Sequence, residues 1–328
     1  MIYDVHAHCV PPKLLDWIEQ SGSRIGISVE ASERGVRFRF EANTTSFMHT
    51  HLIDMERRIS AMDRMGIDIQ LLAGWIDIVG YELPPASGLT YSQIHNNLMA
   101  EEASLHGDRL MPMATVPLQD PQAASVELVR AIKELGMVGV QISTMAGELW
   151  LDQLELDPFW EAAEDLNTLV LIHPGFEIKR LPLNRYFMDN IVGRPAQTTI
   201  ALTGLILSGK LERFPGLKLC AVHGGGFIPY QIGRIQRGFE TNTEDVGKSL
   251  KSSPRESYDR LYFDTIVHDP AALRFLLDSV GAHRVLLGTD YPFEMGDRDP
   301  TALLELVPGL TPQERSLVQS GNIVRLLG

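Results

Sequence analysis

Five side chains that could bind a metal ion or move a proton stand at the ends of apolar runs. His6 and His8 lie two residues apart at the end of the first run, so on a strand both imidazoles project to the same face. His173, His223 and Asp290 close three later runs. A polar group at the end of a buried strand is costly to desolvate without a partner, and a divalent cation supplies one. Three histidines and a carboxylate suit zinc, and manganese or iron also accept such donors.

The elements that must position these residues are eight short apolar runs separated by helical stretches. The runs are Ile2–His6, Ile67–Ala73, Leu110–Val116, Val138–Ser143, Thr168–His173, Lys218–His223, Leu261–Ile266 and Val285–Asp290. Eight such runs interleaved with helices predict a parallel sheet closed into a (β/α)8 TIM barrel. In that fold the carboxyl ends of the strands form the active-site face, so the five side chains should converge there.

The sequence also predicts two of the outer helices and one antiparallel insertion that interrupts the alternation of strands and helices. We predict outer helices over 54–65 and 122–135, the second beginning after Asp120-Pro121 and ending at Gly136. Two alternating runs, 27–30 and 36–40, surround a turn at 33–35 and predict an antiparallel pair. No linker, repeat or low-complexity tract divides the chain. We therefore expect one α/β domain over 1–328, with a small antiparallel β insertion after the first strand, at about 12–50.

Composition limits the partners and the compartment. The 328 residues are 44% hydrophobic and 22% charged, and 42 acidic against 29 basic residues give a net charge of −13. This charge argues against nucleic acid or an anionic membrane as a partner. No apolar run is long enough to cross a bilayer and no signal-peptide pattern opens the sequence, so we expect a cytoplasmic protein. Cys9 and Cys220 lack metal-site spacing, and we interpret them as reduced structural residues.

The other histidines have no converging partner in the sequence. His49, His51, His95, His106 and His283 fall in helical or loop segments, and His268 is expected to be a loop or capping residue.

The motifs together resemble the amidohydrolase superfamily, and most closely its aminocarboxymuconate-semialdehyde decarboxylase branch. They are HxH on the first strand, His-Pro after the fifth, His-Gly-Gly-Gly after the sixth and Gly-Thr-Asp-Tyr-Pro after the eighth. The resemblance continues through segments 62–67, 134–142, 193–201 and 321–322. It implies that His6, His8, His173 and Asp290 hold the metal, while His223 acts as acid/base catalyst beside it. The fourth strand ends at Ser143 with no lysine of the kind that binuclear members carry, which implies one metal.

The same resemblance assigns residues to a carboxylated substrate. Arg39 falls where the decarboxylases place a carboxylate-binding arginine, and Arg234 matches one donated by a neighbouring subunit. A planar guanidinium can hold a carboxylate through two hydrogen bonds. The resemblance therefore implies a homodimer, and Phe293 is expected to line the pocket.

Two departures alter the expected substrate wall. The decarboxylase pattern has a tryptophan after the strand-five His-Pro, where this chain has Gly175 followed by Phe176 and Glu177. It has another tryptophan where this chain has Asn190. We expect Phe176 and Asn190 to contact the substrate and the accepted ring or chain to differ.

Three functions are compatible with the sequence. The first is a mononuclear metal-dependent decarboxylase, zinc being the preferred ion and manganese an alternative, that acts on a small unsaturated or aromatic carboxylate. The second is a hydrolase or hydratase on the same scaffold, because attack on an amide, a C–C bond or an unsaturated keto acid would use the same five residues. A metal-binding or structural protein without activity is the third, and it would have no use for His223.

Overall fold

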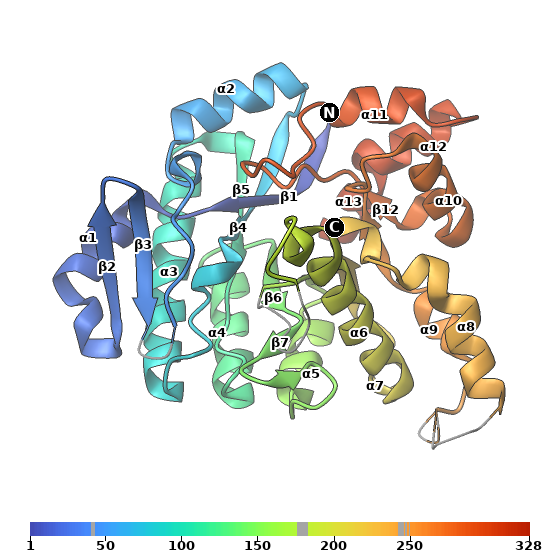
Figure 1. The fold of residues 1–328 in the computed structure, drawn as a ribbon, viewed down its shortest axis with the longest axis horizontal. Helices are drawn as coiled ribbons and strands as arrows, with labels where there is room; N and C mark the ends of the chain where they lie inside the picture. The colour runs from blue at the N-terminus through green and yellow to red at the C-terminus, as the bar shows by residue number, and fades with distance from the viewer. Residues whose placement is uncertain (41–42, 176–182, 242–245, 247, 249) are drawn as a thin grey trace.

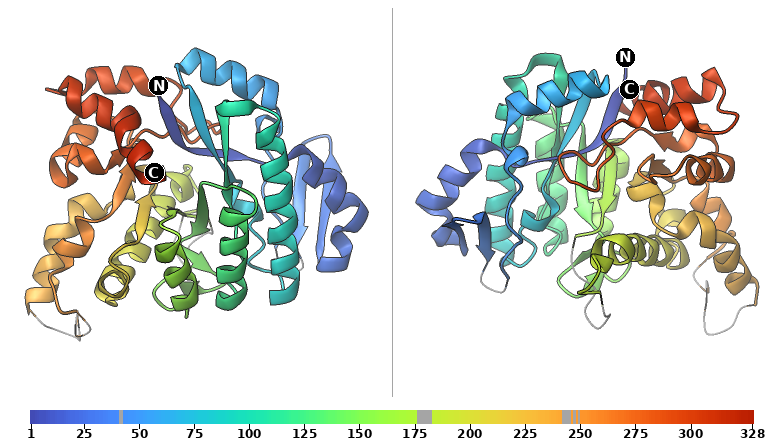
Figure 2. Two further views of the ribbon diagram at one scale, coloured as in Figure 1. Left: turned by 180° about the vertical axis from the view of Figure 1, so that it is seen from behind. Right: turned by 45° about the horizontal axis from the view of Figure 1, so that its top comes forward.

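The computed structural model describes residues 1–40, 43–175, 183–241, 246, 248 and 250–328. Eight parallel strands form one sheet in the order β1-β4-β5-β6-β9-β10-β11-β12, and the helices lie outside the strands (Figure 1, Figure 2). The strands are β1 (Tyr3–Cys9), β4 (Ile69–Gly74), β5 (Leu110–Ala114), β6 (Gly139–Ser143), β9 (Leu169–His173), β10 (Lys218–Ala221), β11 (Tyr262–Asp264) and β12 (Val285–Leu286).

The barrel closes between its first strand and the segment around its last one. The amide of Val5 donates to the carbonyl of Leu287 at 2.9 Å, and the amide of His8 donates to the carbonyl of Tyr291 at 2.7 Å. Every residue of β1 is buried, as expected for a strand packed on both faces. The predicted (β/α)8 barrel is therefore confirmed, with β1 held between β4 and the segment after β12.

Helices cover the outside of the barrel. Their bounds are α1 (Pro12–Ser21), α2 (Met55–Met65), α3 (Pro85–Ser104), α4 (Pro121–Lys133), α5 (Asp157–Asp165), α6 (Arg194–Leu207), α7 (Lys210–Arg213), α8 (Ile228–Thr241), α9 (Pro254–Tyr258), α10 (Pro270–Val280), α11 (Pro300–Leu306), α12 (Pro312–Ser316) and α13 (Asn322–Leu327). Local chemistry sets these limits. The Asp54 carboxylate accepts from the amide of Arg57 at the start of α2, and Gly66 ends that helix with φ 68°.

The predicted antiparallel pair is present as β2 (Ile27–Ser32) and β3 (Gly35–Phe40), a sheet separate from the barrel. It lies with α1 at one side of the barrel, the left side in Figure 1. Phe38 and Phe40 are buried in a cluster with Trp75 and residues of α1. A second small hairpin, β7 (Met145–Ala146) with β8 (Leu149–Trp150), was not predicted, because strands of two residues carry too little pattern. Among the described residues, no helix is long and apolar enough to cross a membrane.

Candidate active site

Four side chains from distant parts of the sequence meet at the carboxyl end of the barrel. His6 and His8 come from β1, His173 from the end of β9 and Asp290 from the segment after β12. One nitrogen or oxygen of each lies within 4.8 Å of the others, and all four residues are buried. The structure thus brings together the four residues that the sequence assigned to a metal.

The hydrogen bonds of the three imidazoles show that the cluster fits a cation. The Nδ1 atom of His6 donates to Asp264 at 2.7 Å, that of His8 to the Gly74 carbonyl at 3.2 Å, and that of His173 to the Pro174 carbonyl at 2.7 Å. Each Nδ1 carries the proton because its partner can only accept, so each Nε2 presents a lone pair.

These lone pairs have no proton donor to satisfy them. The Nε2 atoms of His6 and His8 lie 3.1 Å apart, and Nε2 of His173 is buried without a hydrogen-bond partner. Asp290 Oδ1 lies 3.0 Å from Nε2 of His8. Three lone pairs and a carboxylate that point at one another repel unless a cation lies between them. The residues therefore fit a single divalent ion with three nitrogen ligands and one oxygen ligand.

The protonation states agree with a ligand role. Burial lowers the pKa of His6, although Asp264 opposes this shift. Burial also lowers the pKa of His173 well below its usual range, and the neighbouring imidazoles add to the effect. Burial alone would raise the pKa of Asp290, but the adjacent imidazoles of His223, His8 and His6 outweigh burial and hold this pKa well below its usual range. At neutral pH the imidazoles of His6 and His173 are therefore neutral and the Asp290 carboxylate is charged, as metal ligation requires.

His223 lies beside the cluster. Its Nε2 atom is 3.6 Å from Oδ2 of Asp290, and its ring centroid is 5.2 Å from that of His173. Both His223 and Asp290 have left-handed backbones, with φ of 54° and 58°. Such conformations are unfavourable for residues with a Cβ and recur at functional sites, where the surrounding structure holds them. Here the strain follows from turning each side chain inward where its strand ends.

A pocket of about 530 Å³ opens over these residues, a size suited to a small ligand. Its lining includes His173, His223 and Asp290, together with Trp75, Ile76, Asp77, Asn190, Arg194 and Phe293. Two of the residues expected to contact the substrate, Asn190 and Phe293, therefore face this pocket. The ring of Phe293 lies 5.3 Å from that of His8, measured between centroids.

Two other predicted substrate residues, Arg39 and Arg234, do not line this pocket, and a third is not among the described residues. Arg39 is an exposed residue of β3, pairs with Glu30 at 3.1 Å and does not line the pocket. Arg234 is exposed on α8, away from the pocket of its own chain. Phe176 falls outside the described residues, as does Glu177.

The departure at Gly175 has a packing explanation. A Cβ atom at this position would lie 2.9 Å from Cγ1 of Ile76 and 3.2 Å from Oγ of Ser143. Ile76 and Trp75 both line the pocket, so apolar wall is supplied from the segment after β4. At position 175, where the decarboxylase pattern has a tryptophan, side chains from another strand end therefore occupy the space that a side chain would need.

Three residues that the sequence did not single out belong to the site. Asp264 ends β11 and hydrogen-bonds to His6; the signal was a carboxylate inside the apolar run 261–266. Arg194 lines the pocket and donates to the Pro174 carbonyl at 2.9 Å.

His49 also lines the pocket, with Nε2 3.5 Å from Oε1 of Glu294. His49 and His51 were expected to bind no metal, and neither belongs to the cluster of possible metal ligands found among the described residues, although their rings lie 4.5 Å apart. Nothing in a loop sequence reveals such a contact.

Comparison with known proteins agrees with this geometry. A sequence model of a family described as amidohydrolase matches residues 89–328. The 2-amino-3-carboxymuconate-6-semialdehyde decarboxylase of Dictyostelium discoideum is 31% identical over 326 residues, which cover 99% of this chain and 91% of the relative. The gamma-resorcylate decarboxylase of a Rhizobium strain is 28% identical over 272 residues, which cover 75% of this chain and 79% of the relative.

Solved structures show the same fold. The 5-carboxyvanillate decarboxylase of Sphingomonas paucimobilis superimposes with a TM-score of 0.83 at 23% identity, covering 99% of this chain and 98% of the other. A dihydroxybenzoic acid decarboxylase of Polaromonas, with bound manganese and the inhibitor 2-nitroresorcinol, gives a TM-score of 0.76 at 21% identity. The superposition covers 99% of this chain and 96% of the other. With its site geometry and its sequence relatives, this chain belongs to the amidohydrolase family, in the branch that resembles 2-amino-3-carboxymuconate-6-semialdehyde decarboxylase.

Proposed function

We propose that this protein is a mononuclear metal-dependent decarboxylase of a small unsaturated or aromatic carboxylate. The observation that carries the proposal is the convergence of three imidazole lone pairs and the Asp290 carboxylate under a pocket that also holds His223. The relatives named above are decarboxylases of such compounds, which supports the same reaction class.

The reaction replaces a carboxylate by a proton. The bond to the carboxyl carbon breaks, CO2 leaves, and the electron pair that stays on the substrate carbon takes up a proton. A bound divalent ion would stabilise the negative charge that develops in the substrate. Nε2 of His223 faces the pocket beside Asp290, and we assign it the proton. An imidazole is suited to this step because its ordinary pKa is near 6.5.

Arg194 is our candidate for holding the substrate carboxylate. Its guanidinium is mostly buried at the pocket wall, where its contact with Asp77 is long, 3.8 Å. A guanidinium in such a place can bind a carboxylate through two parallel hydrogen bonds. Arg39 would have to leave Glu30 before it could take this role.

We propose zinc as the resident ion, with manganese as the alternative. Three imidazoles and one carboxylate are a donor set that zinc prefers. The Polaromonas relative and a 5-carboxyvanillate decarboxylase of Novosphingobium aromaticivorans contain manganese, which supports the alternative. Metal analysis of protein purified without added metal distinguishes the two.

We also propose a homodimer in which Arg234 reaches the neighbouring active site. Exposed apolar side chains gather on and near α8: Phe227, at 41% exposure, precedes the helix and Tyr230, at 79%, lies on it. Phe187 and Ile191 are also exposed, at 59% and 54%, and Phe187 lines the active-site pocket. Apolar surface of this kind is typical of protein interfaces. We further propose a cytoplasmic location, in keeping with two free, buried thiols.

The reaction class is tested with the metal-loaded enzyme and carboxylates that the relatives are named for. The panel contains 2-amino-3-carboxymuconate-6-semialdehyde, gamma-resorcylate, 5-carboxyvanillate and 6-methylsalicylate, and CO2 release is measured. We expect CO2 from at least one compound and none with the metal-loaded His223→Ala variant. Hydrolysis of an amide substrate without CO2 release from any carboxylate would instead favour the hydrolase.

A further inference from the structure

A second pocket lies beside the metal site, across the segment that follows Asp290. It has a volume of about 390 Å³, within the range of small-molecule sites. Its walls come from α2, from residues just before α2 and from the segment 289–298. His49, Phe293 and Glu294 line both pockets, so the two sites share one wall.

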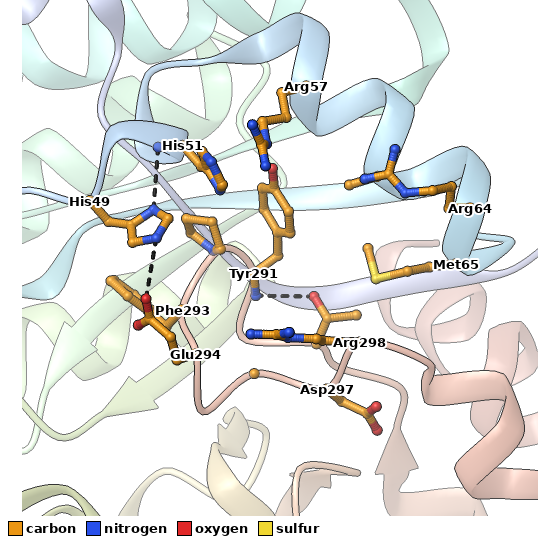
Figure 3. A pocket seen from close by; sticks show the side chains of 14 residues that line it. His49, His51, Arg57, Arg64, Met65, Tyr291, Phe293, Glu294, Asp297 and Arg298 are labelled. Carbon is orange, nitrogen blue, oxygen red and sulfur yellow. Dashed lines mark hydrogen bonds and ion pairs between the residues drawn. The ribbon is translucent and has the colours of Figure 1, made fainter. Parts of the chain in front are cut away.

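Three arginines surround this second pocket. Arg57 and Arg64 come from α2 on one side and Arg298 from the loop on the other, with Tyr291 between them in Figure 3. All three residues are exposed. None has an ion pair with a carboxylate among the residues that the structure describes. Elsewhere in the chain, Arg37, Arg109 and Arg274 do pair with carboxylates.

The acidic residues of the pocket do not neutralise these arginines. Glu294 contacts His49 instead, and its side chain is 75% exposed. Figure 3 shows the Asp297 carboxylate directed away from Arg57 and Arg64, and burial raises the pKa of Asp297. The pocket is therefore basic in a protein whose net charge is −13. An unpaired cluster of guanidinium groups in such a protein favours an anionic ligand.

The remaining surface of the pocket is apolar. Tyr291, Pro292, Phe293 and Met65 contribute rings and a thioether. The Tyr291 ring is held by the guanidinium of the buried Arg58, 4.9 Å from the ring centroid. The Tyr291 hydroxyl is shielded from solvent, so the ring of Tyr291, and not its hydroxyl, is the part that a ligand in the pocket can contact. An anion with an apolar body would satisfy both surfaces.

We propose that this pocket is a second binding site, which takes a small carboxylate with an aromatic or apolar body. Arg57, Arg64 and Arg298 provide the charge, and Tyr291 provides a ring face. This site is separate from the metal and takes no part in the proposed decarboxylation. It adjoins the catalytic pocket through the wall formed by His49, Phe293 and Glu294.

The location of the ligand is tested by crystallography. Crystals of the metal-loaded protein are soaked with 4-bromobenzoate, and the bromine atoms are located by anomalous scattering. We expect a bromine between α2 and the segment 289–298, whether or not a second one lies over the metal. Bromine over the metal alone, or at neither site, would overturn the proposal without deciding whether the protein is a decarboxylase.

The charge requirement is tested in solution by calorimetric titration with 4-bromobenzoate. Arg64→Gln should weaken binding at one site by roughly tenfold, the loss expected for one charge-assisted contact. Arg24→Gln is the matched control, because Arg24 is an exposed arginine of the same charge outside both pockets. The neutral 4-bromobenzamide should not bind there. Equal effects of the two variants, or equal binding of the amide, would contradict an anion site.

Discussion

Asp264 joins the metal cluster to the backbone beside His223. Its Oδ2 accepts a hydrogen bond from Nδ1 of His6 at 2.7 Å, while its Oδ1 accepts from the amide of Gly224 at 2.8 Å. Both Asp264 and His6 are fully buried. Burial alone would raise the pKa of Asp264, but the hydrogen bonds from His6 and from the Gly224 amide oppose burial, and the net pKa is lowered. One charged carboxylate thus fixes the tautomer of a ligand and the position of the acid/base residue.

The Asp264→Asn variant should lose metal affinity. If the amide oxygen of Asn keeps the Gly224 contact, its NH2 group faces Nδ1 of His6 and forces the proton onto Nε2, which can then no longer ligate. Loss of such a supporting partner weakens metal binding by about 10- to 100-fold. Competition with a chromogenic chelator measures this change. Asp278→Asn, at an exposed carboxylate on α10 that pairs with Arg274, is the control, and equal affinities of the two variants would refute the role of Asp264.

The Arg194→Gln variant should impair substrate binding more than metal binding. Removing a guanidinium that holds a carboxylate costs about 1.5–3 kcal/mol, so KM should rise by roughly tenfold to a hundredfold. Steady-state CO2 release and metal content are measured on the same preparation. Arg255→Gln removes an exposed arginine paired with Asp259 and should leave KM unchanged. A normal KM in Arg194→Gln would return the carboxylate role to Arg39.

Two inactive variants should complement each other if Arg234 acts across a dimer interface. Arg234→Ala lacks the donated guanidinium and His223→Ala lacks the proton carrier, but a mixed dimer contains one complete site. Random pairing after co-expression should restore about a quarter of the wild-type activity. Arg237→Ala lies on the same helix, where Arg237 contacts Glu240, and should stay active alone. Full activity of Arg234→Ala alone, or of a monomer in sedimentation experiments, would exclude the shared site.

The burial of His95 should make the free energy of unfolding depend on pH. Burial lowers its pKa to about 4 in the folded protein, against an ordinary value near 6.5 in the unfolded chain. Between pH 6.5 and 4 the unfolded state binds more protons than the folded state. The contribution of His95 to the free energy of unfolding is therefore fully present above this pH range and is lost as the pH falls through it. The expected loss is about 3 kcal/mol at the acid end of the window.

Urea denaturation at pH 7.5 and pH 5.0 measures this loss. The experiment uses metal-free wild type and His95→Gln, so that protonation of the metal ligands contributes equally to both. Wild type should lose more free energy of unfolding between the two pH values than the variant loses. Equal losses would show that His95 is not the responsible group.

The strand pattern was enough to locate the metal cluster. His6, His8, His173 and Asp290 follow apolar runs, and parallel strands in a barrel direct their carboxyl ends to one face. The runs also predicted the start of β10 and β12. Their ends were less accurate, because β12 stops at Leu286 and the chain continues without regular pairing to Asp290.

The alternation of side chains along β3 explains why Arg39 does not line the pocket of its own chain. Phe38 and Phe40 are buried, and successive residues of a strand point to opposite faces. Arg39 lies between them and must therefore point outward, where it meets Glu30 on β2. The alternation in segment 36–40 contained this information. The contacts of Arg194 with Pro174 and Asp77, by contrast, join residues far apart in the sequence, which no local pattern specifies.

We propose that one divalent ion per chain, held by His6, His8, His173 and Asp290, supports decarboxylation. Metal-free protein is titrated with Zn²⁺, and separately with Mn²⁺, while CO2 release from the best substrate of the panel is recorded. Activity should be absent without metal and should rise until one equivalent per chain is bound. Full activity in the metal-free protein, or a rise that continues to two equivalents, would contradict the account.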